Sequence, residues 1–277
     1  MPKVGIVTDS TADMPAGVIE KFGIKVVPLT VRFGTEEFLD KVDLTIQQFY
    51  QKLETCTEIT HPATSQPTPE AFLAAFQELN TDKIICINIA ENLSGTTQSA
   101  RRPQERLSSH DIRVIDSQTT SLGLGFLVEE AAKMAVQQKS LDEIEQEILR
   151  LVPKVRVFAL LDTLKYLEKG GRIGKVSYWL GALLNFKPII KIQKGEVVPV
   201  SRPRTRPKGM DELVRVFAAE GKMQKVGVIH AVDKEEALNI ADTLSRYYPG
   251  EIPIAELGPV LGTHAGPGAI GICGILK

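Results

Sequence analysis

Residues 83–99 have the sequence KIICINIAENLSGTTQS, and this stretch decides the fold. Its first seven residues are mainly apolar and β-branched, which predicts a buried parallel strand. A helix is predicted over 96–107, so Ser94 and Gly95 occupy the turn at the carboxyl end of that strand. Open α/β sheets bind ligands at such turns, where helix N–H groups suit a carboxylate or phosphate. The alternative is that Ser94 only caps the helix.

The composition is that of an ordinary soluble globular protein, with 43% hydrophobic and 24% charged residues. Its 277 residues suffice for two domains. The net charge of −1 gives no broad attraction to nucleic acid or to an anionic membrane. The three cysteines are widely spaced and form neither a metal-ligand pattern nor a disulfide framework. No targeting signal or apolar stretch of transmembrane length is visible, so we expect a cytoplasmic protein.

Strands and helices alternate along the first half of the chain. Strands are expected over 3–7, 24–31, 83–89 and 112–116, and helices over 15–22, 44–53, 70–79, 123–138 and 141–151. Pro28 interrupts the strand over 24–31, which suggests an edge or a bend. A hairpin is expected within 33–43. This alternation is typical of an α/β fold with a doubly wound, mostly parallel sheet. Pro153 ends the pattern, so we predict a Rossmann-like domain over 1–155.

The second half predicts a smaller α/β domain over 156–277, α+β-like and with some antiparallel strands. A β-hairpin is expected over 188–200, with Lys194 and Gly195 in its turn. Further strands are expected over 155–161, 226–231, 252–257 and 269–276, and helices over 162–169, 209–219 and 235–247. The apolar stretch 176–184, with Tyr178 and Trp179, is expected to roof a pocket.

Several polar turns supply candidate ligand-binding residues. Three prolines hold 61–69 as an extended loop, and four glycines and two prolines predict a loop over 258–268. Hydroxyl groups, backbone N–H groups and an imidazole are groups that can hold a carboxylate. The candidates are Thr64, Ser65, Ser94, Gly95 and His264 in these turns, and Ser117 in the turn after the strand expected over 112–116.

A serine and a histidine also suggest a hydrolase with Ser94 as its nucleophile. Ser94 lacks the glycine two residues before it that a nucleophile elbow has, and Asp9 or Asp116 would have to orient His264. For Asp9, hydrogen bonds to loop backbone are favoured over a catalytic or metal-binding role. No phosphate-loop, dinucleotide-binding or zinc-protease motif is present, so no catalytic set, cofactor or metal is predicted.

Two other groups of polar residues have expected local roles. Asp13 or Ser10 is expected to cap the helix at 15–22. The stretch 202–208 holds three arginines and one lysine, which favours a solvated turn or, as the alternative, a docking surface for an acidic partner.

Six motifs follow one another along the chain. They are TDSTADMP at 8–15, TSQP at 64–67, LSGT at 93–96, LKYLEKGGRI at 164–173, KPII at 187–190 and GTHAGPG at 262–268. In this order they resemble the DegV family of bacterial fatty-acid-binding proteins. Within the family likeness the chain differs at Thr97, where an aromatic residue is common, and at Pro103, which interrupts the helix that follows.

The resemblance implies two domains that bury the tail of a long-chain, palmitate-like fatty acid between them. It implies that Thr64 and Ser94 hydrogen-bond the carboxylate and that His264 completes the network. Arg172 and Arg204 match arginines near the headgroup and on a kinase-facing surface. The implied role is a non-catalytic acyl carrier for a fatty acid kinase, which phosphorylates the bound carboxylate. The alternative is a hydrolase or phosphotransferase that uses Ser94 and His264.

Overall fold

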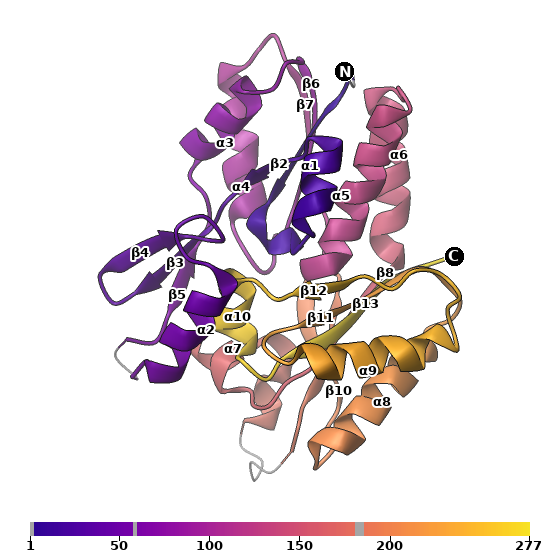
Figure 1. The fold of residues 1–277 in the computed structure, drawn as a ribbon. Helices are drawn as coiled ribbons and strands as arrows, with labels where there is room; N and C mark the ends of the chain where they lie inside the picture. The colour runs from indigo at the N-terminus through magenta and orange to yellow at the C-terminus, as the bar shows by residue number, and fades with distance from the viewer. Residues whose placement is uncertain (1–2, 58–59, 181–185) are drawn as a thin grey trace.

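The computed structural model describes residues 3–57, 60–180 and 186–277, which form three β-sheets surrounded by helices (Figure 1). The first sheet has the strand order β2-β1-β6-β7, and its neighbouring strands are parallel. Its strands are β1 (Gly5–Asp9), β2 (Lys25–Val27), β6 (Lys83–Asn88) and β7 (Asp111–Asp116). The predicted parallel sheet is therefore confirmed, with the apolar run at 83–89 as one of its two central strands.

The second sheet has the strand order β10-β9-β8-β13-β11-β12. Only β11 and β12 pair in parallel, and the other neighbours are antiparallel, as expected for the second half. Lys194 and Gly195 have φ angles of 51° and 75°, which suits the predicted two-residue hairpin turn between β9 and β10. The strands are β8 (Val155–Leu160), β9 (Ile189–Gln193), β10 (Glu196–Ser201), β11 (Met223–His230), β12 (Ile254–Glu256) and β13 (Ile270–Leu276).

The third, smaller sheet includes residues from two segments that were predicted differently. It has the order β4-β3-β5 and consists of β4 (Glu36–Leu39), β3 (Thr30–Phe33) and β5 (Ala63–Ser65). The strand predicted over 24–31 is interrupted at Pro28, as expected, and β2 lies at the edge of the first sheet, but the part after Pro28 joins the third sheet instead. The loop predicted over 61–69 contains β5, because Pro62 and Pro67 flank the strand rather than interrupt it, and Thr64 pairs with Val31.

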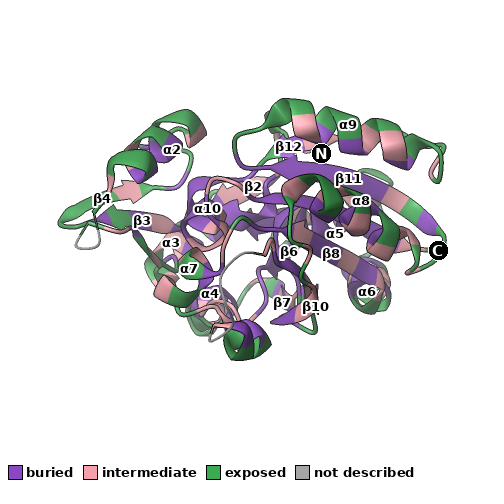
Figure 2. Ribbon diagram, turned by 90° about the horizontal axis from the view of Figure 1, so that it is seen from below, coloured by how far each residue is buried: buried purple, intermediate pink, exposed green. Residues whose placement is uncertain are grey.

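Helix α5 lies between the two larger sheets. It contacts β1 and β6 of the first sheet and β8, β11 and β13 of the second. One cluster of buried apolar side chains consequently includes Ile87 from the first sheet and Val157 from the second. Figure 2 shows the strands β8 and β11 mainly in the colour of buried residues, whereas the outer side of α9 is exposed. Sheet membership changes at Val155, but the division into two domains there stays a prediction.

The described helices largely follow the predicted periodicity. The capping box of Ser140 and Glu143 is present at the start of α6. The helix predicted over 209–219 starts earlier, with Pro207 in its first turn, and the helix predicted over 162–169 starts at Lys165. The helices are α1 (Ala16–Phe22), α2 (Ile46–Thr55), α3 (Pro69–Gln77), α4 (Thr96–Arg101), α5 (Ser121–Val136), α6 (Leu141–Leu151), α7 (Lys165–Lys169), α8 (Arg206–Ala218), α9 (Lys234–Ser245) and α10 (Pro259–Ala265).

One loop prediction and one helix prediction need correction. The loop predicted over 258–268 contains α10, whose first turn holds Pro259 and whose end is set by Gly266 at a φ of 80°. The helix predicted over 96–107 ends at Arg101 and continues as a short 3₁₀ helix, Arg102–Arg106, because Pro103 has no N–H group to donate.

The acidic turn after β1 holds loops together instead of capping α1. The N-cap of α1 is Pro15, which makes no side-chain bond, so the predicted cap by Asp13 or Ser10 is wrong. Asp13 accepts hydrogen bonds from the Lys41 ammonium (2.6 Å), the Ser121 hydroxyl (2.9 Å) and the Gly258 N–H (3.0 Å). The fully buried Asp13 thereby joins the starts of α5 and α10.

Candidate functional site

A cavity lies between the two larger sheets. The turn after β6, the strand β5 and the helix α10 form one side, and strands β8, β9 and β13 form the other. Its volume is about 130 Å³. Most of its wall is apolar, and representative residues are Leu29, Ile89, Val157, Ile190, Leu257 and Ile270.

Polar side chains from distant parts of the chain line the same cavity. Thr64 lies on β5, Ser94 lies in the turn after β6, and His264 lies on α10. The Thr64 hydroxyl and Nε2 of His264 are 2.9 Å apart, although 200 residues separate them in sequence. Packing of α10 against β3 and β5 brings these two side chains together. The three residues that the sequence singled out therefore line one cavity.

His264 is held in its neutral form by its surroundings. Burial lowers its pKa to about 4, and the positive charge of Arg172 acts in the same direction. Nδ1 of the ring is buried and has no hydrogen-bond partner among the described residues. In the tautomer with the proton on Nε2, the ring donates to the Thr64 hydroxyl, and the Thr64 O–H group can donate into the cavity. In the other tautomer, Nε2 accepts the Thr64 O–H group.

Gly170 makes room for that imidazole ring. A β-carbon at this position would overlap Nδ1 of His264 and lie 2.7 Å from its Cε1. The backbone of Gly170 is in the ordinary right-handed region, with φ −77° and ψ −3°, so space rather than conformation requires glycine here. Gly170 is the C-cap residue of α7, and this helix packs against α10.

Arg172 brings a positive charge to the cavity. Its Nε donates to the Leu93 carbonyl (3.0 Å) and its Nη1 to the Gly170 carbonyl (2.9 Å). Both partners are neutral, and none of the carboxylates in the described residues forms an ion pair with this guanidinium. A cation without a protein anion beside a largely apolar cavity attracts an anionic group of a ligand.

The Ser94 hydroxyl makes local bonds at the start of α4. It lies 2.8 Å from the Thr96 hydroxyl and accepts the Thr96 N–H at 3.3 Å. The N-cap residue of α4 is Gly95, which makes no side-chain bond, so the simple capping alternative for Ser94 is only partly met. Because Ser94 also lines the cavity, its oxygen lies between the helix start and the space for a ligand.

The remaining candidates have different surroundings. Ser65 lines the cavity, whereas Gly95 does not, since the side chain of Gln66 lies directly over it. The Ser117 hydroxyl is fully buried and donates to the Thr119 carbonyl at 3.2 Å, away from the cavity wall. Neither Tyr178 nor Trp179 belongs to the described wall, and residues 181–184 of that predicted roof lie outside the described residues.

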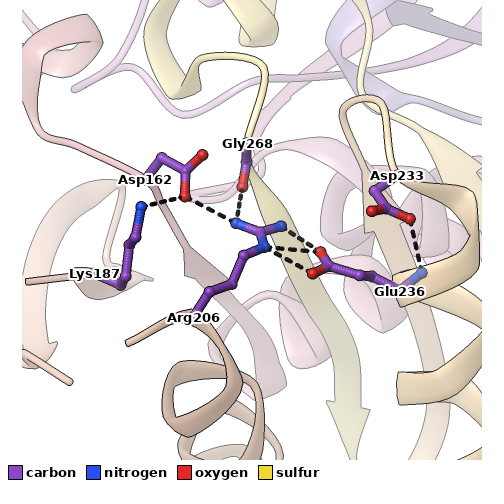
Figure 3. Close-up of polar contacts among 6 residues, drawn as sticks. All are labelled: Asp162, Lys187, Arg206, Asp233, Glu236 and Gly268. Carbon is purple, nitrogen blue, oxygen red and sulfur yellow. Dashed lines mark hydrogen bonds and ion pairs between the residues drawn. The ribbon is translucent and has the colours of Figure 1, made fainter. Parts of the chain in front are cut away.

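The stretch 202–208 divides into internal and exposed cations. Arg206 donates to both oxygens of Glu236, to Asp162 (3.0 Å) and to the Gly268 carbonyl (2.8 Å), as Figure 3 shows. Arg202 lies over the rings of Trp179 and Phe186. Arg204 is exposed and lies outside the cavity wall.

In the described part of the chain, Asp9, Asp116 and Ser94 do not form a serine-hydrolase arrangement with His264. Asp9 accepts hydrogen bonds from the N–H groups of Thr11 (2.9 Å) and Ile89 (2.8 Å), which confirms the predicted backbone role. Asp116 accepts the N–H groups of Glu91 (3.2 Å) and Gln118 (2.9 Å). Neither carboxylate orients His264, whose hydrogen bond goes to Thr64 rather than to Ser94.

One residue that lines the cavity was missed by sequence reasoning. Thr120 precedes α5, is 8% exposed, and its hydroxyl has no partner in the described part of the chain. The hydroxyl-rich turn after β7 indicates a ligand-binding residue, but the sequence gives no reason to prefer Thr120 over Ser117 in that turn. Only the packing of α5 against the second sheet separates the two residues.

The described residues hold no group of three His, Cys, Asp or Glu side chains placed to bind a metal ion. Among the described helices, none has both the length and the apolar character needed to cross a membrane. The fold and the cavity define an α/β protein with an apolar pocket, whose polar groups are hydroxyls, a neutral imidazole and an unpaired guanidinium. Such a pocket suits a small amphiphilic molecule.

The chain belongs to the DegV family. The model of this family of uncharacterised proteins matches residues 3–277. A DegV domain-containing protein of Caldanaerobacter subterraneus subsp. tengcongensis is 36% identical over 282 residues, covering 98% of each chain.

Solved structures share the whole fold. The crystal structure of DegV from Bacillus subtilis, described as a fatty acid binding protein, has a TM-score of 0.90 and 32% identity, with 100% of both chains covered. A stearic acid-binding protein of Eubacterium ventriosum has a TM-score of 0.90 and 27% identity, covering 100% of this chain and 99% of the other. The family resemblance inferred from the six motifs is therefore confirmed.

Proposed function

We propose that this protein binds a long-chain, palmitate-like fatty acid in the cavity between its two larger sheets. The observation that carries the proposal is the pairing of an apolar cavity with the unpaired cation of Arg172. Relatives of the same fold that bind fatty acids support it. In this proposal the protein carries the acid and does not transform it.

The carboxylate lies where Thr64, Ser94 and Arg172 converge on the cavity. In this proposal His264 carries its proton on Nε2, donates to the Thr64 oxygen 2.9 Å away, and so turns the Thr64 hydroxyl proton toward the ligand. Each charge-assisted hydrogen bond contributes about 1.5–3 kcal/mol. Ser65 lies beside Thr64 on β5 and completes the polar end.

The acyl tail fills the apolar part of the cavity. Each buried methylene contributes about 0.8 kcal/mol before the cost of association, so ten of them give roughly 8 kcal/mol. This gross term is several times larger than one headgroup bond. The tail therefore supplies most of the affinity, and the headgroup residues fix which end of the acid lies at Arg172.

The test measures palmitate affinity by isothermal titration calorimetry on delipidated protein. Arg172→Gln removes the charge and leaves a shorter, polar side chain, and should weaken binding about tenfold to a hundredfold. Arg204→Gln is the matched control, because Arg204 is exposed and outside the cavity wall, and its affinity should equal that of the unaltered protein. Equal losses in both variants, or no palmitate binding at all, would refute the proposal.

The same protein tests the catalytic alternative. A hydrolase or phosphotransferase that uses Ser94 would turn over acyl esters or ATP without a partner, and Ser94→Ala would abolish that rate. A carrier shows no turnover, and Ser94→Ala weakens palmitate binding by about tenfold.

We also propose that the carrier presents the bound carboxylate to a fatty acid kinase, an encounter we expect in the cytoplasm. Arg204 is exposed and free to meet an acidic partner surface, whereas Arg206 is engaged internally (Figure 3). Arg204→Glu should reduce kinase-dependent acyl phosphate formation and leave palmitate affinity unchanged. Undiminished acyl phosphate formation with this variant would count against the docking role of Arg204.

A further inference from the structure

The Thr120 hydroxyl is a polar group that the proposed headgroup site does not use. Thr120 is 8% exposed and lines the cavity, and its Oγ1 finds no hydrogen-bond partner among the described residues. An unpaired buried hydroxyl destabilises the folded state. Valine has the same shape without that cost, so a purely apolar tail gives no reason for threonine here.

The start of α5 adds a second polar feature at the same place. Thr120 is the N-cap residue of this 16-residue helix but makes no side-chain cap bond. The next residue, Ser121, has a φ of 54° and donates its hydroxyl to Asp13 (2.9 Å), so Ser121 is already paired. Both residues line the cavity, which places the positive end of the helix dipole against the ligand space.

Thr120 is separated from the proposed headgroup site but lies on the neighbouring loop. The Thr119 carbonyl accepts the Ala90 N–H (2.9 Å), and the Ala90 carbonyl accepts the Ser94 N–H (3.1 Å). The loops that carry Ser94 and Thr120 follow the adjacent parallel strands β6 and β7, which lie about 4.8 Å apart. An acyl chain that starts at Ser94 therefore meets the second polar position within the same cavity.

We propose that Thr120 and the start of α5 form a subsite for an oxygen atom on the acyl chain, so that the cavity accepts hydroxy and keto fatty acids. The Thr120 O–H group donates to that oxygen, and the helix dipole favours its partial negative charge. Rotation about the Cα–Cβ bond of Thr120 exchanges its methyl and hydroxyl groups, so an unsubstituted chain meets the methyl group instead. This inference rests on the proposed binding of fatty acids.

The experiment compares two hydroxylated acids with their parents by calorimetry. The pairs are 3-hydroxypalmitate with palmitate and 12-hydroxystearate with stearate. With Thr120→Val, at least one hydroxylated acid should lose about fivefold to tenfold in affinity relative to its parent. Thr120→Ser keeps the hydroxyl and should retain the ratio of the unaltered protein.

The outcomes separate this inference from the proposed function. If neither palmitate nor stearate binds the unaltered protein, the fatty acid function fails. If the parents bind but Thr120→Val leaves both ratios unchanged, the oxygen subsite is refuted and the hydroxyl has no role in ligand choice. The melting temperature of Thr120→Val provides the folding control, because removal of an unpaired buried hydroxyl should leave it equal or higher.

Discussion

The contact between Gly170 and His264 gives a sharp test of the polar end of the cavity. Gly170→Ala adds one methyl group, which would overlap Nδ1 of His264 and lie 2.7 Å from its Cε1. Carbon atoms in contact are about 3.5 Å apart, so the ring must move by at least roughly 0.8 Å. A shift of that size moves Nε2 out of its 2.9 Å hydrogen-bond geometry with the Thr64 hydroxyl and weakens or breaks the bond.

Two consequences follow for the Gly170→Ala variant. Forcing a methyl group into packed space should lower the free energy of unfolding by about 1–3 kcal/mol. Palmitate affinity should fall by roughly fivefold to tenfold, because Thr64 loses the partner that orients its hydroxyl. Urea unfolding and calorimetry measure the two effects.

A double-mutant cycle with His264→Ala isolates the cause. In that background the ring is gone, so Gly170→Ala should cost less than 0.5 kcal/mol, as the backbone of Gly170 suits alanine. Gly17→Ala is the matched control, since Gly17 lies in α1 with open space beside it, and alanine there should stabilise the protein slightly. Equal destabilisation by Gly170→Ala with and without His264 would refute the reasoning.

Two more predictions concern charged groups away from the headgroup. Arg206→Ala should lower the free energy of unfolding by about 1–3 kcal/mol, because it leaves Glu236 and Asp162 without this partner. Arg204→Ala should change the free energy of unfolding by less than about 0.5 kcal/mol. Equal melting temperatures for the two variants would contradict the network in Figure 3. Burial raises the pKa of Asp40 to about 6, despite the opposing charge of Lys41. Protonation of Asp40 therefore favours the folded state. Its contribution to stability is present below pH 4 and is lost as the pH rises through 6. Asp40→Asn should therefore raise the melting temperature at pH 8 more than at pH 4, and a uniform shift at both values would show that Asp40 is not the titrating group.

The sequence alone determined the elements whose signals are local. The apolar run at 83–89 became a strand of the parallel sheet, and the Lys194-Gly195 turn formed the predicted hairpin. The six ordered motifs identified the family, which a match over residues 3–277 confirms. Each of these features depends on neighbouring residues, through side-chain periodicity or turn conformation, so sequence reasoning could find them.

Only the tertiary structure decided the parts whose stability comes from distant partners. Residues 258–268 look like a glycine-rich loop, but Asp13 holds the Gly258 N–H, and α10 forms against β3 and β5. Thr64 joined a strand because Val31 pairs with it. The same holds for the bond between Thr64 and His264, the space at Gly170 and the unpaired hydroxyl of Thr120. Each depends on chain segments that come into contact only in the folded protein, so local sequence patterns could not predict it.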